Sequence, residues 1–218
     1  MYAYLTDPEL DNRREAVINF AKETIKSKNI DLRKKYMTEL YYHSFHVAEI
    51  AVFIGQLLTL NTYELIDMAT GAILHDYGKS FIDPVILYKD GPLTDEEYEE
   101  VKMHPKVGYE GLLPYHFNEQ VMDIVLHHHE RPDGTGYPDG ISDIKLYTRI
   151  VTVSDIFDAI HQKRAYHDGK SSRETMKILK QEQGLDPVIV KIFEEAMEKC
   201  DYEDVFPKKN ILKTAFEI

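Results

Sequence analysis

The chain has 218 residues, a length typical of one domain, and 43% of them are hydrophobic, so it can bury a core. Its formal net charge of −12 argues against a surface that binds nucleic-acid polymers or anionic membranes. The single cysteine excludes an intrachain disulfide. No stretch approaches the ~20 apolar residues of a membrane span or the apolar run of a signal peptide. We therefore expect a soluble, cytoplasmic protein.

The spacing of apolar residues predicts an all-α fold, because they recur at intervals of three and four between helix start and stop signals. Thr94 and Ser171 are each followed three residues later by glutamate, which is the pattern of a capping box. Asn61 and Asn118 are also suitable N-caps. A tyrosine pair at 41–42 predicts a bend. The expected helices cover 7–26, 32–41, 43–58, 62–75, 94–112, 118–127, 146–163, 172–183 and 187–200.

Two segments interrupt the helical pattern. Segment 78–91 contains Pro84 and is expected to be a connector with at most one short helix. Segment 130–143 holds three glycines and two prolines within nine positions, which no helix or central strand tolerates. The sequence therefore predicts a Gly/Pro-rich loop at this second place.

Residues that can bind a metal lie near the ends of the expected helices. His75 and Asp76 place an imidazole beside a carboxylate, which suits a divalent first-row metal, although an ordinary helix end with a solvated acid would look the same. Glu39 and His43 are four residues apart and therefore share a helix face. Asp155 is surrounded by apolar residues, and a buried carboxylate needs a cation or strong donors. Together these positions favour a metal site.

Other histidines stand where the backbone can fix their ring direction. His104 precedes Pro105, and three consecutive histidines at 127–129 occupy a junction between a helix and the Gly/Pro-rich loop. Asp158 comes one helical turn after Asp155. We expect Asp158 to support a neighbouring residue or a helix end rather than to bind metal.

Six blocks of the sequence resemble, in order, those of the HD-GYP branch of the HD-domain metal-dependent phosphohydrolases. They lie between Glu39 and Phe193 and read YYHSFHVAEIA, AILHDYGKSFIDPVILYKDGPLTDEE, HPKVGYEGL, HHERPDGTGYP, RIVTVSDIFDAI and GLDPVIVKIF. The resemblance implies an HD-domain helical bundle with the Gly/Pro-rich loop beside a metal site. Accordingly, we expect an N-terminal helical extension (1–36), a catalytic domain (37–200) and a C-terminal tail (201–218).

The resemblance also implies the metal ligands. Two or three divalent ions, usually iron or manganese in this family, would be bound, with Asp76 bridging two of them. Glu39 matches a glutamate of members that hold three metals. Within the run 127–129, the Glu130 and Arg131 that follow favour the last two histidines as ligands. The implied ligands are Glu39, His43, His75, Asp76, His104, His128, His129 and Asp155.

The reaction implied by the resemblance is hydrolysis of cyclic di-GMP to pGpG, with further hydrolysis to GMP left open. It would proceed by attack of a metal-bound hydroxide on phosphorus. The implied catalytic residues are Asp76 and Lys79. Lys79, Tyr137 and Arg164 are implied to bind substrate, the lysine and arginine through phosphate and the tyrosine through guanine.

Two alternatives stay open. His167 stands where the family commonly has arginine or lysine, so the chain could be a phosphohydrolase of another cyclic dinucleotide or nucleotide. It could also be a non-catalytic module that binds cyclic di-GMP or docks to a signalling protein through the Gly-Tyr-Pro loop. The N-terminal extension is expected either to pack on the core or to form a homodimer.

Overall fold

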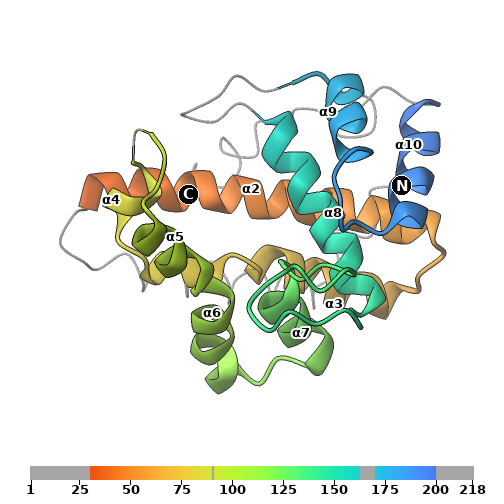
Figure 1. Ribbon diagram of the computed structural model, residues 1–218. Coiled ribbons are helices and arrows are strands. Elements are labelled where there is room, and N and C mark those ends of the chain that lie inside the picture. Colours follow the sequence, from red (N-terminus) through yellow and green to blue (C-terminus); the bar gives the residue numbers. More distant parts are fainter. Residues whose placement is uncertain (1–29, 90, 163–169, 200–218) are drawn as a thin grey trace, which may run out of the picture.

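A computed structural model describes residues 30–89, 91–162 and 170–199 (Figure 1). Every regular element within these ranges is helical, which confirms the all-α prediction. None of these helices is both long enough and apolar enough to cross a membrane. The elements are α2 (Ile30–Leu57), α3 (Thr62–Leu74), η2 (Tyr77–Phe81), α4 (Pro84–Leu87), α5 (Asp95–Lys102), α6 (His104–Leu112), η3 (Leu113–Tyr115), α7 (Glu119–His127), α8 (Leu146–His161), α9 (Ser172–Leu179) and α10 (Pro187–Met197).

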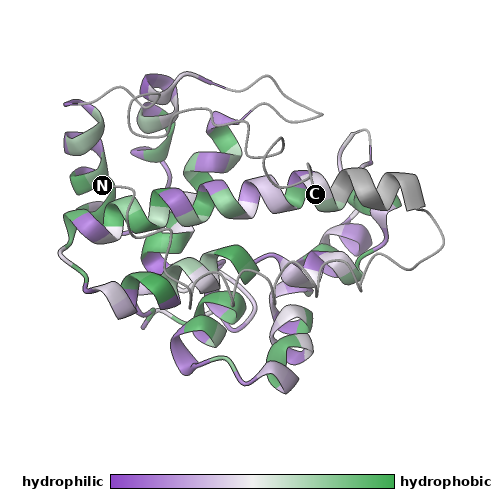
Figure 2. Cartoon of the chain, turned by 180° about the vertical axis from the view of Figure 1, so that it is seen from behind, coloured by the Kyte–Doolittle hydropathy of each residue, from purple (hydrophilic) through white to green (hydrophobic). Residues whose placement is uncertain are grey.

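The core forms around the long helix α2, against which α3 and α8 pack (Figure 1). Val47, Ile50 and Ile54 are fully buried on one face of α2, at the spacing of three and four that the sequence predicted. Met68 of α3 and Phe157 of α8 belong to the same buried cluster. Apolar residues gather where these helices meet (Figure 2). Burial of one such side chain contributes about 1.5–3 kcal/mol, so this core fixes the helices that carry the polar site.

Helix α2 is continuous through the tyrosine pair, so the two helices predicted over 32–41 and 43–58 are one. The sequence between Ile30 and Leu57 has no proline, and its single glycine is Gly55, so nothing removes a backbone hydrogen bond near the tyrosines. Tyr41 instead packs on Phe45 one turn later, with ring centroids 4.4 Å apart. The result is one rigid helix.

The helix predicted over 94–112 is two helices, and the reason is Pro105. Proline has no N–H and its ring clashes with the carbonyl four residues earlier, here that of Val101. Helix α5 therefore ends at Lys102, and α6 begins at His104 with Pro105 in its first turn. This break gives the His104 ring its direction, as described below.

The predicted caps are present. Asn61, Thr94 and Ser171 each accept the N–H of a glutamate three residues later, whose carboxylate accepts the N–H of the cap in return. Asn118 accepts the N–H of Val121. Pro84 begins the short helix α4 expected in the connector. These local signals set the starts of the helices correctly.

Two predicted boundaries differ from the structure or fall outside it. Helix α9 ends at Leu179 rather than at residue 183, because Leu179 is its last buried apolar residue and the polar segment after it turns at Gly184, whose φ is 74°. The helix predicted over 7–26 lies outside the described residues, as does the tail at 201–218. The division into extension, domain and tail stays a prediction.

Candidate metal centre

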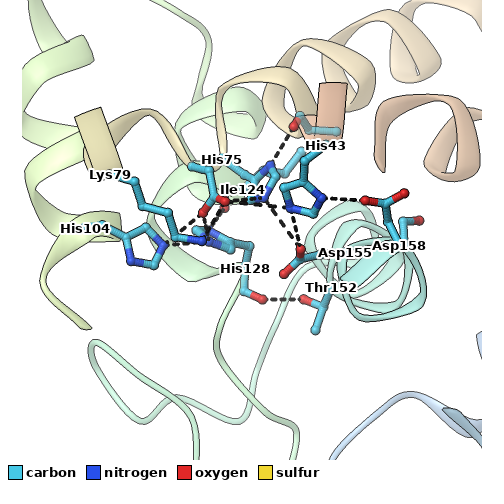
Figure 3. A network of polar contacts seen from close by, with 12 residues as sticks. His43, His75, Lys79, His104, Ile124, His128, Thr152, Asp155 and Asp158 are labelled. Atoms are coloured by element: carbon cyan, nitrogen blue, oxygen red, sulfur yellow. Dashed lines mark hydrogen bonds and ion pairs between the residues drawn. The ribbon is translucent and has the colours of Figure 1, made fainter. Parts of the chain in front are cut away.

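Five helices direct polar side chains to one place in the interior (Figure 3). Helix α2 contributes a histidine, the end of α3 a histidine and an aspartate, the start of α6 a histidine, the end of α7 two histidines and α8 an aspartate. These are seven of the eight predicted ligands. The residues are His43, His75, Asp76, His104, His128, His129 and Asp155.

Three of the histidines are oriented in the same way by helix ends. Nδ1 of His75 lies 2.7 Å from the carbonyl oxygen of Ala72, three residues earlier. Nδ1 of His104 lies 2.7 Å from the carbonyl of Val101, and Nδ1 of His128 lies 3.0 Å from that of Val125. A carbonyl only accepts, so each Nδ1 carries a proton, and the lone pair that a neutral imidazole offers to a metal is then the one on Nε2. All three lone pairs face the centre.

Asp76 lies between two sets of imidazoles. Its Oδ1 is 3.2 Å from Nε2 of His104 and 3.7 Å from Nε2 of His128. Its Oδ2 is 3.4 Å from Nε2 of His75 and 3.7 Å from Nε2 of His43. The carboxylate is 1% exposed, so it has almost no contact with water. Each of its oxygens therefore belongs to a different group of nitrogen atoms.

The ligand-type atoms form two groups that share Asp76. One group is Asp76, His104, His128 and His129, and the other is His43, His75 and Asp76, with the atoms of each group within 4.8 Å of one another. Carboxylate and imidazole ligands suit divalent iron, manganese and other first-row metals. A carboxylate shared by two groups is the arrangement that a pair of ions needs.

The donor atoms fit cations rather than one another. Nε2 of His104 and Nε2 of His128 lie 3.2 Å apart, although the proton of each neutral ring is already engaged at Nδ1. Nε2 of His75 is buried and has no hydrogen-bond partner among the described residues. Buried polar atoms without a partner are costly, and a positive ion between these lone pairs would satisfy them all. The residues present therefore fit metal ions.

The protonation states favour the same conclusion. Burial lowers the pKa of His128 to about 4 and that of His129 well below 6.5, so both rings are neutral at pH 7. Burial alone would raise the pKa of Asp76, but the positive charge of Lys79 and the neighbouring imidazoles outweigh it and hold that pKa well below 3.8. Neutral imidazoles and an ionised carboxylate are the forms that bind metal.

His43 is held from both sides by acids of α8. Its Nδ1 donates to Oδ2 of Asp158 at 2.6 Å, and its Nε2 lies 3.0 Å from Oδ1 of Asp155. Burial alone would lower the pKa of His43, but these two carboxylates raise it to about 9. Asp158 also lies 3.5 Å from Nδ1 of His46 and is fully buried. A carboxylate on the far nitrogen fixes the tautomer and the direction of an imidazole ligand.

Two predicted residues lie at the edge of this centre. Glu39 is exposed, belongs to neither group of ligand atoms, and accepts a hydrogen bond from the hydroxyl of Tyr88 at 2.9 Å. Lys79 extends from η2, and its Nζ lies 2.6 Å from Oδ2 of Asp76. The lysine thus places a positive charge directly at the shared carboxylate.

The Gly-Tyr-Pro loop lies against the histidines of α7. The ring of Tyr137 stacks on that of His129, with centroids 4.7 Å apart and planes at 28°. Nζ of Lys102 is 5.6 Å from the centroid of the same tyrosine. Burial raises the pKa of the Tyr137 hydroxyl, so this group stays protonated. Arg164, the third residue implied to bind substrate, lies outside the described residues.

Sequence reasoning missed several residues that hold this centre together. Thr152 donates to the carbonyl of His128 at 2.8 Å, and Glu130 accepts three backbone N–H groups of the Gly/Pro-rich loop. Tyr88 holds Glu39. Of these residues only Glu130 could have been found from the sequence, because it is an acid directly before a loop whose backbone N–H groups need acceptors outside a helix. The partners of Thr152 and Tyr88 depend on contacts between distant helices.

Comparison with known proteins agrees with this architecture. The chain belongs to the HD domain family, whose match covers residues 8–189. Within that family it is related to cyclic-dinucleotide phosphodiesterases of the HD-GYP kind. A solved HD-GYP-type protein from Bdellovibrio bacteriovorus has the same fold, with a TM-score of 0.60 and 19% identity over 86% of this chain and 62% of that one.

Two curated relatives are similar in sequence. A cyclic di-GMP phosphodiesterase of Pseudomonas aeruginosa is 35% identical over 161 residues, which are 72% of this chain and 39% of the relative. The 3′3′-cGAMP-specific phosphodiesterase 1 of Vibrio cholerae is 33% identical over 144 residues, 65% of this chain and 33% of the relative. The chain thus covers well under half of each relative's length.

Proposed function

We propose that the chain is a metal-dependent phosphodiesterase of cyclic dinucleotides. The observation that supports this most is the pair of buried ligand groups that share Asp76. A buried cluster of imidazoles, among them the neutral rings of His128 and His129, around ionised carboxylates is expensive to fold unless it binds something positive. Such a cluster beside a loop that carries the half-buried ring of Tyr137 is suited to a substrate with both phosphates and bases.

The residues of the site have separate roles in the proposed reaction, namely metal binding, phosphate binding and contact with a base. His43, His75, Asp76 and Asp155 would hold one ion, and Asp76, His104, His128 and His129 the other, with iron or manganese as the proposed metals. Two bound divalent ions would polarise the phosphoryl oxygens and supply hydroxide at neutral pH. Lys79 places its ammonium within reach of a phosphate oxygen bound beside Asp76. Tyr137 offers an aromatic face for a nucleobase.

Cyclic di-GMP is the proposed substrate and pGpG the first product. The Pseudomonas relative, named for that substrate, supports this choice. Cyclic GMP-AMP is the second candidate, supported by the Vibrio relative named for it. The two substrates differ in one base, so a direct comparison of kcat/KM decides between them.

The test is anaerobic purification with metal analysis, followed by product analysis on both cyclic dinucleotides. His75→Ala removes a fully buried ligand and is expected to abolish turnover and lower bound metal. His116→Asn is the matched control, because this exposed histidine has a φ of 54°, which asparagine tolerates. A wild-type protein that binds cyclic dinucleotides but turns none over with any metal would instead support the non-catalytic binding module. A third ion at Glu39 and the homodimer or signalling partner stay predictions.

A further inference from the structure

Glu130 is a fully buried acid that belongs to neither metal-ligand group. It follows His129 directly, and its carboxylate points to the other end of the Gly/Pro-rich loop. Oε1 accepts the N–H of Asp139 at 2.6 Å and that of Gly140 at 3.0 Å, and Oε2 accepts the N–H of Ile141 at 3.1 Å. Three successive backbone donors thus converge on one carboxylate.

These hydrogen bonds join the two ends of the loop at 131–138. Hydrogen bonds from backbone N–H groups to an ionised carboxylate are among the strong hydrogen bonds of proteins. The three N–H groups lie outside any helix, so no helical carbonyl accepts them. Without Glu130 they would donate to water or to carbonyl groups of the loop. The carboxylate therefore sets how closely the returning chain approaches α7.

The close approach determines where the Tyr137 ring lies. The N–H of Tyr137 is 3.3 Å from the carbonyl oxygen of His129. At Gly136 an added Cβ would lie 2.4 Å from Cα of Glu130 and 2.5 Å from N of Arg131, so the loop touches the chain just after His129. The tyrosine ring stacks on the ring of His129 in this same region.

We infer that Glu130 is a positioning residue that holds the loop so that the ring of Tyr137 covers His129. It would act on a nucleotide only through this tyrosine. The kinetic consequence rests on the proposed function, because it concerns substrate binding. The structural consequence is that the Glu130 carboxylate joins the two ends of the loop, and this does not depend on the proposed function.

The first test measures the loop itself. Glu130→Gln keeps the shape of the side chain but places an NH2 group against one of the N–H donors. Hydrogen exchange of the amides at 139–141 is expected to speed up about tenfold or more in metal-free protein. Asp133→Asn is the matched control, because exposed Asp133 bonds only Thr135 within the same loop and asparagine can accept the same N–H. Equal exchange in wild type and Glu130→Gln overturns the inference.

The second test asks whether Glu130 acts through Tyr137. Glu130→Gln is expected to raise KM for cyclic di-GMP about tenfold with bound metal unchanged. In a Tyr137→Ala background the same change is expected to have no further effect on KM. Two independent, additive effects would overturn the inference, because they would give Glu130 a role separate from the tyrosine.

The role of Glu130 can still be tested if Glu130→Gln does not fold or if the wild-type protein is inactive. If Glu130→Gln does not fold, exchange in the unmodified protein is the measurement. The amides at 139–141 are then expected to be protected at least about tenfold more than that of Thr135, and equal rates overturn the inference. If the wild-type protein turns over no cyclic dinucleotide, the proposed function fails while the exchange result still decides the role of Glu130.

Discussion

Gly78 is the point at which η2 touches α6, so Gly78→Ala tests how strongly the site depends on that contact. A Cβ at Gly78 would lie 1.8 Å from the carbonyl oxygen of His104 and 2.7 Å from N of Gly108. Both neighbours are backbone atoms and cannot turn aside. Ordinary contact begins at 3.4 Å, so the two elements must separate by about 1.5 Å.

The expected cost follows from this separation. Overpacking of a core usually costs about 1–3 kcal/mol, and a backbone clash of this size belongs at the upper end. The separation also moves His104 away from Asp76, whose Oδ1 is now 3.2 Å from Nε2 of that histidine. A displacement of 1 Å at a reacting centre lowers turnover by about a hundredfold. Gly78→Ala should therefore lose both stability and activity.

The assay combines urea unfolding, metal analysis and turnover. Gly111→Ala on α6 is the control, because the nearest atoms to its Cβ would be side-chain atoms of Tyr77, at 3.0 Å, and of Phe81, at 3.6 Å. It is expected to cost less than about 1 kcal/mol. A Gly78→Ala protein with wild-type stability and full metal content would refute this reasoning, because η2 and α6 would then be free to separate without consequence.

Three further predictions concern protons and metal. Burial lowers the pKa of His128 from 6.5 in the unfolded chain to about 4 in the folded one, so this residue alone should cost the metal-free protein about 3 kcal/mol of unfolding free energy as pH falls through that interval, and the lowered pKa values of His104 and His129 add to the loss; a flat urea-unfolding profile would contradict this. Asp158→Asn removes the carboxylate that orients His43 and should weaken metal binding about 10–100-fold in chelator competition, and an unchanged affinity would show that the backbone alone orients the ring. Glu39→Ala should remove about one ion per chain, and Tyr88→Phe should weaken that same ion, while unchanged metal content in Glu39→Ala would exclude a third ion there.

The helices could be predicted because their signals are local, whereas the full set of site residues was implied by the resemblance of six sequence blocks to the HD-GYP family. A capping box such as that at Thr94 is readable within four residues, and His75 and Asp76 are adjacent in the chain. The division of the helix at Pro105 was also readable, since proline has no N–H to bond the carbonyl of Val101 and its ring clashes with it, but the expected helix ran through it. The capping box and the apolar spacing over 94–112 thus led to a wrong prediction although the proline indicated a break.

What could not be predicted depends on contacts between distant segments. The hydrogen bond between His43 and Asp158 joins residues 115 positions apart, and no spacing in the sequence shows it. The attachment of Glu39 to Tyr88 likewise requires the end of α4 to lie against α2. Local patterns thus identify which residues are available, whereas packing decides which of them meet.

The carbonyl groups that orient three of the histidines come from the chain just before each ring, so the ligand directions are tied to where the helical segments stop. A residue inserted or deleted within α3 would turn its last residues by about 100° around the helix axis and shift them by about 1.5 Å along it. His75 would then point away from Asp76 and the other ligand-type side chains although none of these residues had changed. Single-residue insertions in the bodies of α3 and α7 should accordingly be as damaging as loss of one of these histidines.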